Sequence, residues 1–165
     1  MKKNEPSQGP QGVAFLLAQV GAHAAARFAE LLAPLHLSPP HAGILRVLSK
    51  SAGLSQQELA STLNMHPSRL VGLVDELETN GILERQEKVD DRRTHALHLT
   101  DEGQAILGEI SRIAKEHQDS LLASLGKEER EQLAEILQRI ADDQGLTPGV
   151  HPGFSRIGRK GRPKC

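Results

Sequence analysis

The feature that most constrains the fold is a change in the spacing of apolar residues between positions 55 and 99. Residues 55–79 repeat apolar side chains every three or four positions, which is the period of an amphipathic helix. Residues 82–86 and 94–99 form two short runs typical of strands, and in the second run apolar and polar side chains alternate. The sequence therefore predicts helices followed by a β-hairpin.

Two cap signals divide the helical part into two helices. Ser55 and Glu58 have the S-x-x-E spacing of a capping box, so a short helix is expected to begin there. The stretch 64–67 ends it, and Pro67 suits the first position of the next helix because proline has no amide proton to leave unpaired. This second helix is expected to end before Asn80-Gly81. Two helices joined by a tight turn form a helix-turn-helix.

Helical periodicity also marks the sequence on both sides of this region. An Ala-rich apolar face runs through residues 13–33, and Ser38 with the prolines after it suits the start of a helix that continues to about Lys50. Thr100 can cap a long helix that Gly126 ends, and residues 127–141 form another. The predicted fold class is mainly α with a small β-wing, the wing being the hairpin with the charged tip 87–93.

The order of these elements and four motifs resemble the MarR/SlyA family of bacterial transcription regulators. The most specific motif is similar to the family's wing and the start of its fifth helix: Asp91-Arg92-Arg93-x-x-x-Leu97-x-Leu99-Thr100-x-x-Gly103. Three other stretches support it: Leu54-Ser55-x-x-Glu58-Leu59-Ala60, Leu73-Val74-Asp75-x-Leu77-x-x-x-Gly81-Ile82-Leu83-x-Arg85, and Leu125-x-x-Glu128-Glu129-Arg130-x-x-Leu133. The match covers about residues 12–143.

The resemblance implies a homodimer whose first, fifth and sixth helices interlock, with a double-stranded DNA operator as partner. Without a partner, the terminal helices would expose apolar stripes. The predicted organisation is a flexible N-terminus at 1–11, a MarR-type domain at 12–144 and a flexible basic tail at 145–165. Within the domain, the winged helix-turn-helix covers about 38–100, and the dimerisation helices cover about 12–33 and 101–142.

The second helix of the helix-turn-helix is expected to contact DNA bases. Its apolar side chains face the core, which turns Ser68, Arg69 and Gly72 toward solvent and hence toward a major groove. Arg69 is the first candidate for a base contact, since arginine can donate two parallel hydrogen bonds to guanine. Ser68 can donate to a phosphate or a base, and Val71 can contact a thymine methyl group. The alternative is that Arg69 contacts only phosphate or solvent.

The charged tip of the hairpin suits the minor groove, whose negative potential attracts guanidinium groups. The resemblance implies that Arg92 enters the groove while Asp91 and Arg93 brace the wing; the alternative is a solvated loop. Residues 55–100 hold five Lys and Arg residues against eight Asp and Glu residues. Each subunit is therefore expected to neutralise few phosphates, so DNA binding should require the dimer.

The family resemblance also implies a small effector, often a phenol or another aromatic anion, bound between the dimer helices and the DNA-binding part. Helix position suggests six candidate lining residues: Phe15, His23, Arg27, His41, Leu45 and Arg46. The effector would release a repressor from a pseudo-palindromic operator. Its identity, the operator sequence, the regulated genes and the choice between repressor and activator are not encoded in any motif of the sequence.

Eight histidines make a zinc-responsive regulator of the same fold an alternative. His95 and His98 lie three apart on a strand and so point to opposite faces, which excludes a local chelate. His23, His36, His41 and His117 could converge between helices, but no HxxxH pair or cysteine pair supports them. No metal or other cofactor is therefore predicted. A dimeric interaction module that does not bind DNA is the alternative from a different class.

Several other functions are disfavoured by the sequence. It contains no Gly-rich phosphate loop, no GxSxG and no recognisable catalytic carboxylate pair, so we expect no enzyme. No apolar run suits a membrane span or a signal peptide, so we expect a cytoplasmic protein. Cys165 is a bystander thiol or, alternatively, a redox sensor. Residues 155–165 hold five basic and no acidic side chains, which suit nonspecific phosphate attraction or an AT-hook-like contact.

Overall fold

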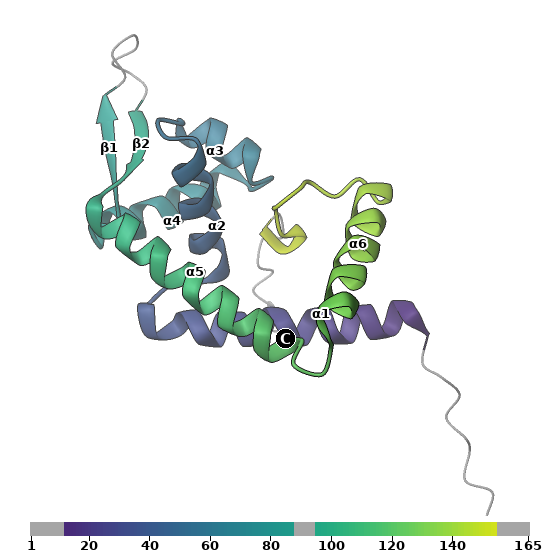
Figure 1. Ribbon diagram of the computed structural model, residues 1–165. Helices are drawn as coiled ribbons and strands as arrows, with labels where there is room; N and C mark the ends of the chain where they lie inside the picture. Colours follow the sequence, from purple (N-terminus) through teal and green to yellow (C-terminus); the bar gives the residue numbers. More distant parts are fainter. Residues whose placement is uncertain (1–11, 88–94, 155–165) are drawn as a thin grey trace, which may run out of the picture.

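The computed structural model describes residues 12–87 and 95–154, and shows a mainly helical fold with one two-stranded antiparallel sheet (Figure 1). The elements in chain order are α1 (Val13–Leu32), η1 (Ala33–Leu35), α2 (Pro39–Lys50), α3 (Gln56–Thr62), α4 (Pro67–Thr79), β1 (Leu83–Glu87), β2 (His95–Leu99), α5 (Asp101–Leu121), α6 (Lys127–Asp143) and η2 (Pro152–Phe154). The predicted fold class is confirmed.

The helix boundaries follow the cap signals in the sequence. At the start of α3, the Ser55 hydroxyl accepts from the Glu58 amide at 3.3 Å, and the Glu58 carboxylate accepts from the Ser55 amide at 2.7 Å. Pro67 takes the first position of α4. Gly81 follows α4 with φ +70°, a left-handed conformation that glycine adopts without steric cost. The predicted helix-turn-helix is therefore confirmed over α3 and α4.

The hairpin pairs β1 with β2 so that Leu83 lies opposite Leu99 and Arg85 lies opposite Leu97. Leu97 also forms an isolated bridge with Leu54, which joins the hairpin to the turn before α3. The sequence predicted strands at 82–86 and 94–99, within one residue of the observed bounds. Residues 88–94, which connect the two strands, lie outside the described part of the chain.

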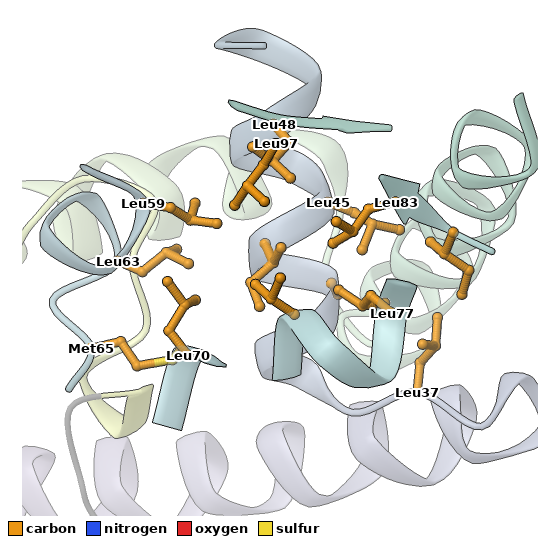
Figure 2. Packing of buried hydrophobic residues seen from close by; sticks show 14 of the residues in the cluster. Leu37, Leu45, Leu48, Leu59, Leu63, Met65, Leu70, Leu77, Leu83 and Leu97 are labelled. Atoms are coloured by element: carbon orange, nitrogen blue, oxygen red, sulfur yellow. The ribbon is translucent and has the colours of Figure 1, made fainter. Parts of the chain in front are cut away.

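The buried core lies in the part of the chain from α2 to β2, which we call the winged lobe (residues 38–100). Figure 2 shows leucines from α2, α3, α4 and the two strands converging on one another. The fully buried side chains of this lobe are Ile44, Leu45, Leu48, Leu59, Leu63, Leu70, Val74, Leu77, Leu83 and Leu97. Burial of so many large apolar side chains stabilises the lobe without help from another chain.

Thr100 and Gly103 join the winged lobe to the first turn of α5. The Thr100 hydroxyl donates to the carbonyl of Gly81 at 2.6 Å and accepts from the amide of Gly103 at 3.0 Å, so it also caps α5 as predicted. Gly103 packs so closely on Ile82 that an added Cβ would lie 2.0 Å from the Ile82 carbonyl oxygen. Only glycine fits this position, which fixes the first turn of α5 against the start of the wing.

Helices α1, α5 and α6 leave apolar side chains on the surface. Helix α1 packs on α5, and α5 packs on α2, but every residue of α6 is at least partly exposed. The sequence predicted that α5 continues to Gly126; instead it ends at Leu121, and Gly126 is the N-cap of α6, where its amide donates to the Glu129 carboxylate at 2.7 Å. Residues 122–125 form the turn that connects α5 to α6.

The first part of the predicted flexible tail, directly after α6, has a defined conformation in the structure. Residues 145–154, which we call the C-terminal segment, turn back from α6 toward α2 and end in η2 (Figure 1). The Leu146 amide donates to the Ala141 carbonyl at 3.0 Å, and Phe154 is 7% exposed. The Gly and Pro content that suggested a loose tail instead permits a tight path with a buried aromatic ring. Residues 155–165, including the basic cluster and Cys165, lie outside the described residues.

Candidate DNA-binding surface

A tight turn between α3 and α4 leads into the exposed start of α4. The Met65 amide donates to the Ala60 carbonyl at 2.9 Å, and Asn64 adopts a positive φ of 49°. His66 is the N-cap of α4, where its Nδ1 lies 3.3 Å from the Ser68 amide and 2.8 Å from the Ser68 hydroxyl. These contacts fix the first turn of α4 at the surface of the winged lobe.

The two faces of α4 are divided as the sequence predicts. Leu70, Val74 and Leu77 are fully buried. Ser68 and Gly72 are exposed, and Val71 is 42% exposed. The candidate side chains Ser68, Val71 and Gly72 therefore share an accessible face of α4 that a DNA groove could contact.

Arg69 belongs to the same helix but is partly buried and already engaged. Its Nη1 donates to the carbonyl oxygen of Phe154 at 2.9 Å. The sequence predicted a side chain turned toward solvent. The C-terminal segment accounts for the difference, because its last described residue reaches the recognition-helix side of the fold.

Arg85, on β1, is the residue that fixes the wing to α4, and the sequence reasoning did not assign it this role. Its Nη2 lies 2.5 Å from the Asp75 carboxylate, and its Nη1 donates to Glu78. Burial lowers the pKa of Arg85, but the hydrogen bonds and negative charges of Asp75 and Glu78 outweigh burial and raise it. The pair Asp75 and Arg85, ten residues apart, offered no local signal of this contact.

His41 holds α2 against α4. Its Nδ1 accepts from the Ser38 amide at 3.1 Å, and its Nε2 lies 3.1 Å from the carboxylate of Glu76. Burial lowers the pKa of His41, while the charge and hydrogen bond of Glu76 raise it; burial has the larger effect, so the net direction is downward. His41 therefore serves as a helix cap and as a bridge to α4.

Arg92, predicted to enter the minor groove, and the predicted braces Asp91 and Arg93 lie outside the described residues. The strands on either side of them are described. Residues 87 and 95 pair where β1 ends and β2 begins. Figure 1 shows this end projecting away from α5 on the side of α3 and α4. The two strands therefore extend beyond the helices of the winged lobe, as those of a wing do (Figure 1).

A cavity of about 690 Å³ lies between the winged lobe and the terminal helices. Side chains of α1, α2, α5 and α6 form its walls, and the C-terminal segment completes them. The walls are mostly apolar, with the guanidinium of Arg46 among them; Arg46 also donates to the carbonyl of Gly149. Such a site suits a ligand with a ring and a negatively charged or polar group.

The structure brings only one of the six candidate effector-binding residues to this cavity, namely Arg46. Leu45 is fully buried in the core, and His41 is occupied by Ser38 and Glu76. Phe15, His23 and Arg27 lie exposed on α1, away from the cavity walls. The other five do not line this cavity, whose walls depend on the rotation of α1 and α2 and on the return of the C-terminal segment.

The eight histidines do not form a metal site in the described part of the chain. No cluster of three or more His, Cys, Asp and Glu side chains there could hold a metal ion. His117 instead stacks on Phe28, with ring centroids 5.8 Å apart. Among the described helices, none is both long and apolar enough to span a bilayer.

Comparison with protein-family models places residues 37–95 in the MarR family. A putative transcriptional regulatory protein for the hcr operon of Thauera aromatica is 31% identical over 112 residues, which are 68% of each chain. The transcriptional repressor Rv2887 of Mycobacterium tuberculosis is 29% identical over 129 residues, which are 78% of this chain and 93% of the relative.

Solved structures share the fold described above. The transcriptional repressor CouR, solved bound to a 23-mer DNA duplex, has a TM-score of 0.70 and 32% identity, with 86% of this chain and 98% of that chain covered. The complex of Rv2887 with DNA has a TM-score of 0.69 and 26% identity, covering 79% and 98%. Wild-type MarR from E. coli, with a TM-score of 0.69 at 22% identity, shares the fold over 80% and 98%.

Proposed function

Because this chain belongs to the MarR family of DNA-binding transcription regulators, we propose that it is a homodimeric repressor of a pseudo-palindromic operator. The observation that carries the proposal is α4, which is anchored by a buried face and presents Ser68, Val71 and Gly72 on an exposed one. Two copies related by a two-fold axis would place two such helices in successive major grooves. The family makes the chain a regulator rather than an enzyme.

The dimer rests on the apolar side chains that α1 and α6 expose. Those at least 39% exposed are Val13, Phe15, Leu16, Leu17, Val20, Ile136, Leu137 and Ile140. Exposed apolar side chains gathered on two helices in this way are costly in water and favour an interaction surface. A second copy of the chain, offering the same helices, would cover it in an isologous contact.

Base and phosphate contacts are divided between α4 and the wing. Arg69 would donate to guanine in the major groove, with Ser68 and Val71 beside it. Arg92 would enter the minor groove, with Asp91 and Arg93 bracing the tip. Arg85 keeps the wing at a fixed angle to α4, so both contacts are held in one register.

The cavity is the site for an effector, which we propose to be a small aromatic or phenolic anion. Its apolar walls suit a ring, and Arg46 retains N–H donors beyond the one that contacts Gly149. An effector weakens DNA binding only if it favours the state in which the recognition helices are wrongly placed. The position of the cavity between the winged lobe and α1, α5 and α6 permits this coupling.

Replacing Arg69 and Arg92 separately by alanine tests the proposal. Loss of the Arg69 guanidinium should cost about 1–3 kcal/mol per half-site and relax the preference at one symmetric pair of bases. Loss of Arg92 should weaken binding to all sequences and reduce the salt slope by about one per site. Titration of both variants on single-base variants of an operator, selected from a random duplex pool, at two salt concentrations separates these effects.

The matched control is Arg112→Ala on α5, which removes an exposed guanidinium that is engaged by Glu109 and Glu116. This variant should bind the operator as the unchanged protein does. If the Arg69 and Arg92 variants also bind every duplex unchanged, residues 66–93 do not recognise DNA. If no duplex is enriched by the unchanged protein, a dimeric interaction module replaces the repressor.

A further inference from the structure

The C-terminal segment follows a defined path back to the winged lobe. The Gly145 amide donates to Asp142 at 3.0 Å, the Val150 amide to Thr147 at 3.1 Å and the Phe154 amide to His151 at 2.9 Å, all onto carbonyl oxygens. Gly145 and Gly149 have positive φ angles of 65° and 71°, which allow the reversals of direction. These bonds make the segment a folded element.

Phe154 anchors the segment in a position that only a glycine on α2 leaves open. The ring is 7% exposed, and a Cβ added to Gly43 would lie 2.8 Å from its Cε2 atom. The His151 ring packs beside it, with centroids 5.7 Å apart. A single methyl group on Gly43 would therefore displace the ring, because two non-bonded carbon atoms cannot lie 2.8 Å apart.

Two arginines of the winged lobe hold the backbone of the segment. Arg46 on α2 donates to the Gly149 carbonyl, and Arg69 on α4 donates to the Phe154 carbonyl at 2.9 Å. Arg69 is the only one of the proposed base-contacting side chains that is partly buried. The same ten residues therefore contact the recognition helix and form part of the cavity wall.

We propose that the C-terminal segment is an autoinhibitory element, which when docked on Gly43 withholds Arg69 from DNA. The proposal rests on the proposed function, in which Arg69 contacts a base. A bidentate contact with guanine needs both parallel N–H groups of the guanidinium, extended from the helix. The hydrogen bond to Phe154 holds the guanidinium against the docked segment, so Arg69 cannot extend to a base until the segment undocks.

Because docking of the C-terminal segment and base contact by Arg69 exclude each other, each weakens the other. If the segment is docked in about 90% of molecules, operator affinity falls by about tenfold, because only the undocked fraction binds fully. By the same linkage, operator DNA must release the segment. A ligand that packs against the docked segment in the cavity would favour the form with weaker DNA binding, which gives the effector a physical route to α4.

The test uses Gly43→Ala, which blocks the seat of the ring while leaving the segment and α4 unchanged. Phe154→Ala removes the ring and leaves the seat open. Gly108→Ala on α5 is the matched control, since a Cβ there meets no atom within 4 Å. Circular dichroism checks that each protein is folded, and a duplex selected from a random pool with the unchanged protein serves as the DNA probe.

Two measurements are made on each protein: operator affinity, and hydrogen exchange of the amides in residues 145–154. In the unchanged protein and in Gly108→Ala, we expect slow exchange that becomes faster when the duplex is added. In Gly43→Ala and Phe154→Ala, exchange should be fast without DNA, and the duplex should bind about tenfold more tightly. Combining both substitutions should give no further gain, because each removes the same docked state.

Several outcomes would overturn the inference while leaving the repressor intact. The first is fast exchange in the unchanged protein without DNA, and the second is exchange that the duplex does not accelerate. The third is fast exchange in both variants with operator affinity equal to or weaker than that of the unchanged protein. Failure of the proposed function differs from all three, because then no duplex is enriched by the unchanged protein or by either variant.

Discussion

Helices α4 and α6 have the same kind of sequence pattern and opposite environments. Both repeat apolar side chains every three or four residues. In α4, Leu70, Val74 and Leu77 are completely buried, whereas in α6, Ile136 is 46% exposed and Leu137 is 39% exposed. Helix α4 lies inside the winged lobe, against α2, α3 and β1, and α6 stands apart from that lobe (Figure 1).

The contrast shows that apolar periodicity identifies a face but not what covers it. In α4 the covering residues come from the same chain, so the apolar face of α4 is buried without a second copy. In α6 the covering residues have to come from another chain. The exposed apolar side chains of α1 also lack a covering surface within the described residues. A second copy of the chain meets both needs at once, and mutations of the two helices should therefore have different consequences.

The largest expected effect is that of Ile136→Asp combined with Leu137→Asp. Two carboxylates per subunit would have to leave water in the dimer, so the dissociation constant should rise by about 1,000-fold or more. Sedimentation should show the mass of a single chain, and circular dichroism should show that the winged lobe stays folded. A folded protein of unchanged dimeric mass would remove α6 from the interface.

Leu77→Ala in α4, compared with Leu137→Ala in α6, should have the next largest effect. Loss of a fully buried leucine lowers the free energy of unfolding by about 2–5 kcal/mol, whatever the protein concentration. The α6 variant should lose stability by an amount that depends on protein concentration, because its partner surface is on another chain. Urea unfolding at two protein concentrations makes the comparison. Equal, concentration-independent losses would show that α6 packs within its own chain.

The smallest expected effect concerns His41, which joins α2 to Glu76 of α4. Its pKa is lower in the folded protein than the ordinary value of 6.5, so the unfolded chain binds the proton more tightly. Stability from this group is complete above pH 6.5 and decreases as pH falls below it. Urea unfolding at pH 8 and pH 5 should show a smaller loss in His41→Gln than in the unchanged protein.

The other histidines contribute equally to both proteins, so the difference between the two pH dependences isolates His41. Glu76→Gln is the matched variant, since it removes the charge that raises the pKa of His41 and leaves burial, which lowers it. The loss on acidification should be greater in this variant. An identical dependence in all three proteins would mean that protonation of His41 does not change between the folded and unfolded states.

The winged lobe was predictable from sequence because its determinants are local. Ser55, Glu58, Pro67 and Gly81 act within a few residues of themselves, and each marks a helix end in the structure. The end of α5 was predicted about four residues too late, since Gly126 caps the following helix instead of stopping α5. A glycine indicates that a helix boundary is near, but it can follow the end of one helix or precede the start of the next.

The site was less predictable, since it depends on contacts between distant residues. The exposed face of α4 follows from its buried one, and Ser68, Val71 and Gly72 lie where the pattern places them. The engagement of Arg69 needs Phe154, 85 positions later, and the cavity needs the return of the C-terminal segment. Glycine and proline in residues 145–154 indicated disorder by composition, whereas here their backbone angles permit a fold.

The junction at Thr100 and Gly103 gives α5 the mechanics of a lever. A helix of 21 residues is about 31 Å long, and one of its ends is fixed to the wing and to the last turn of α4. A tilt of about 5° at the far end therefore swings the winged lobe by about 3 Å as one body. A displacement of this size is comparable with the rise of one base pair, so the spacing of two recognition helices can be adjusted from a distance without bending either of them.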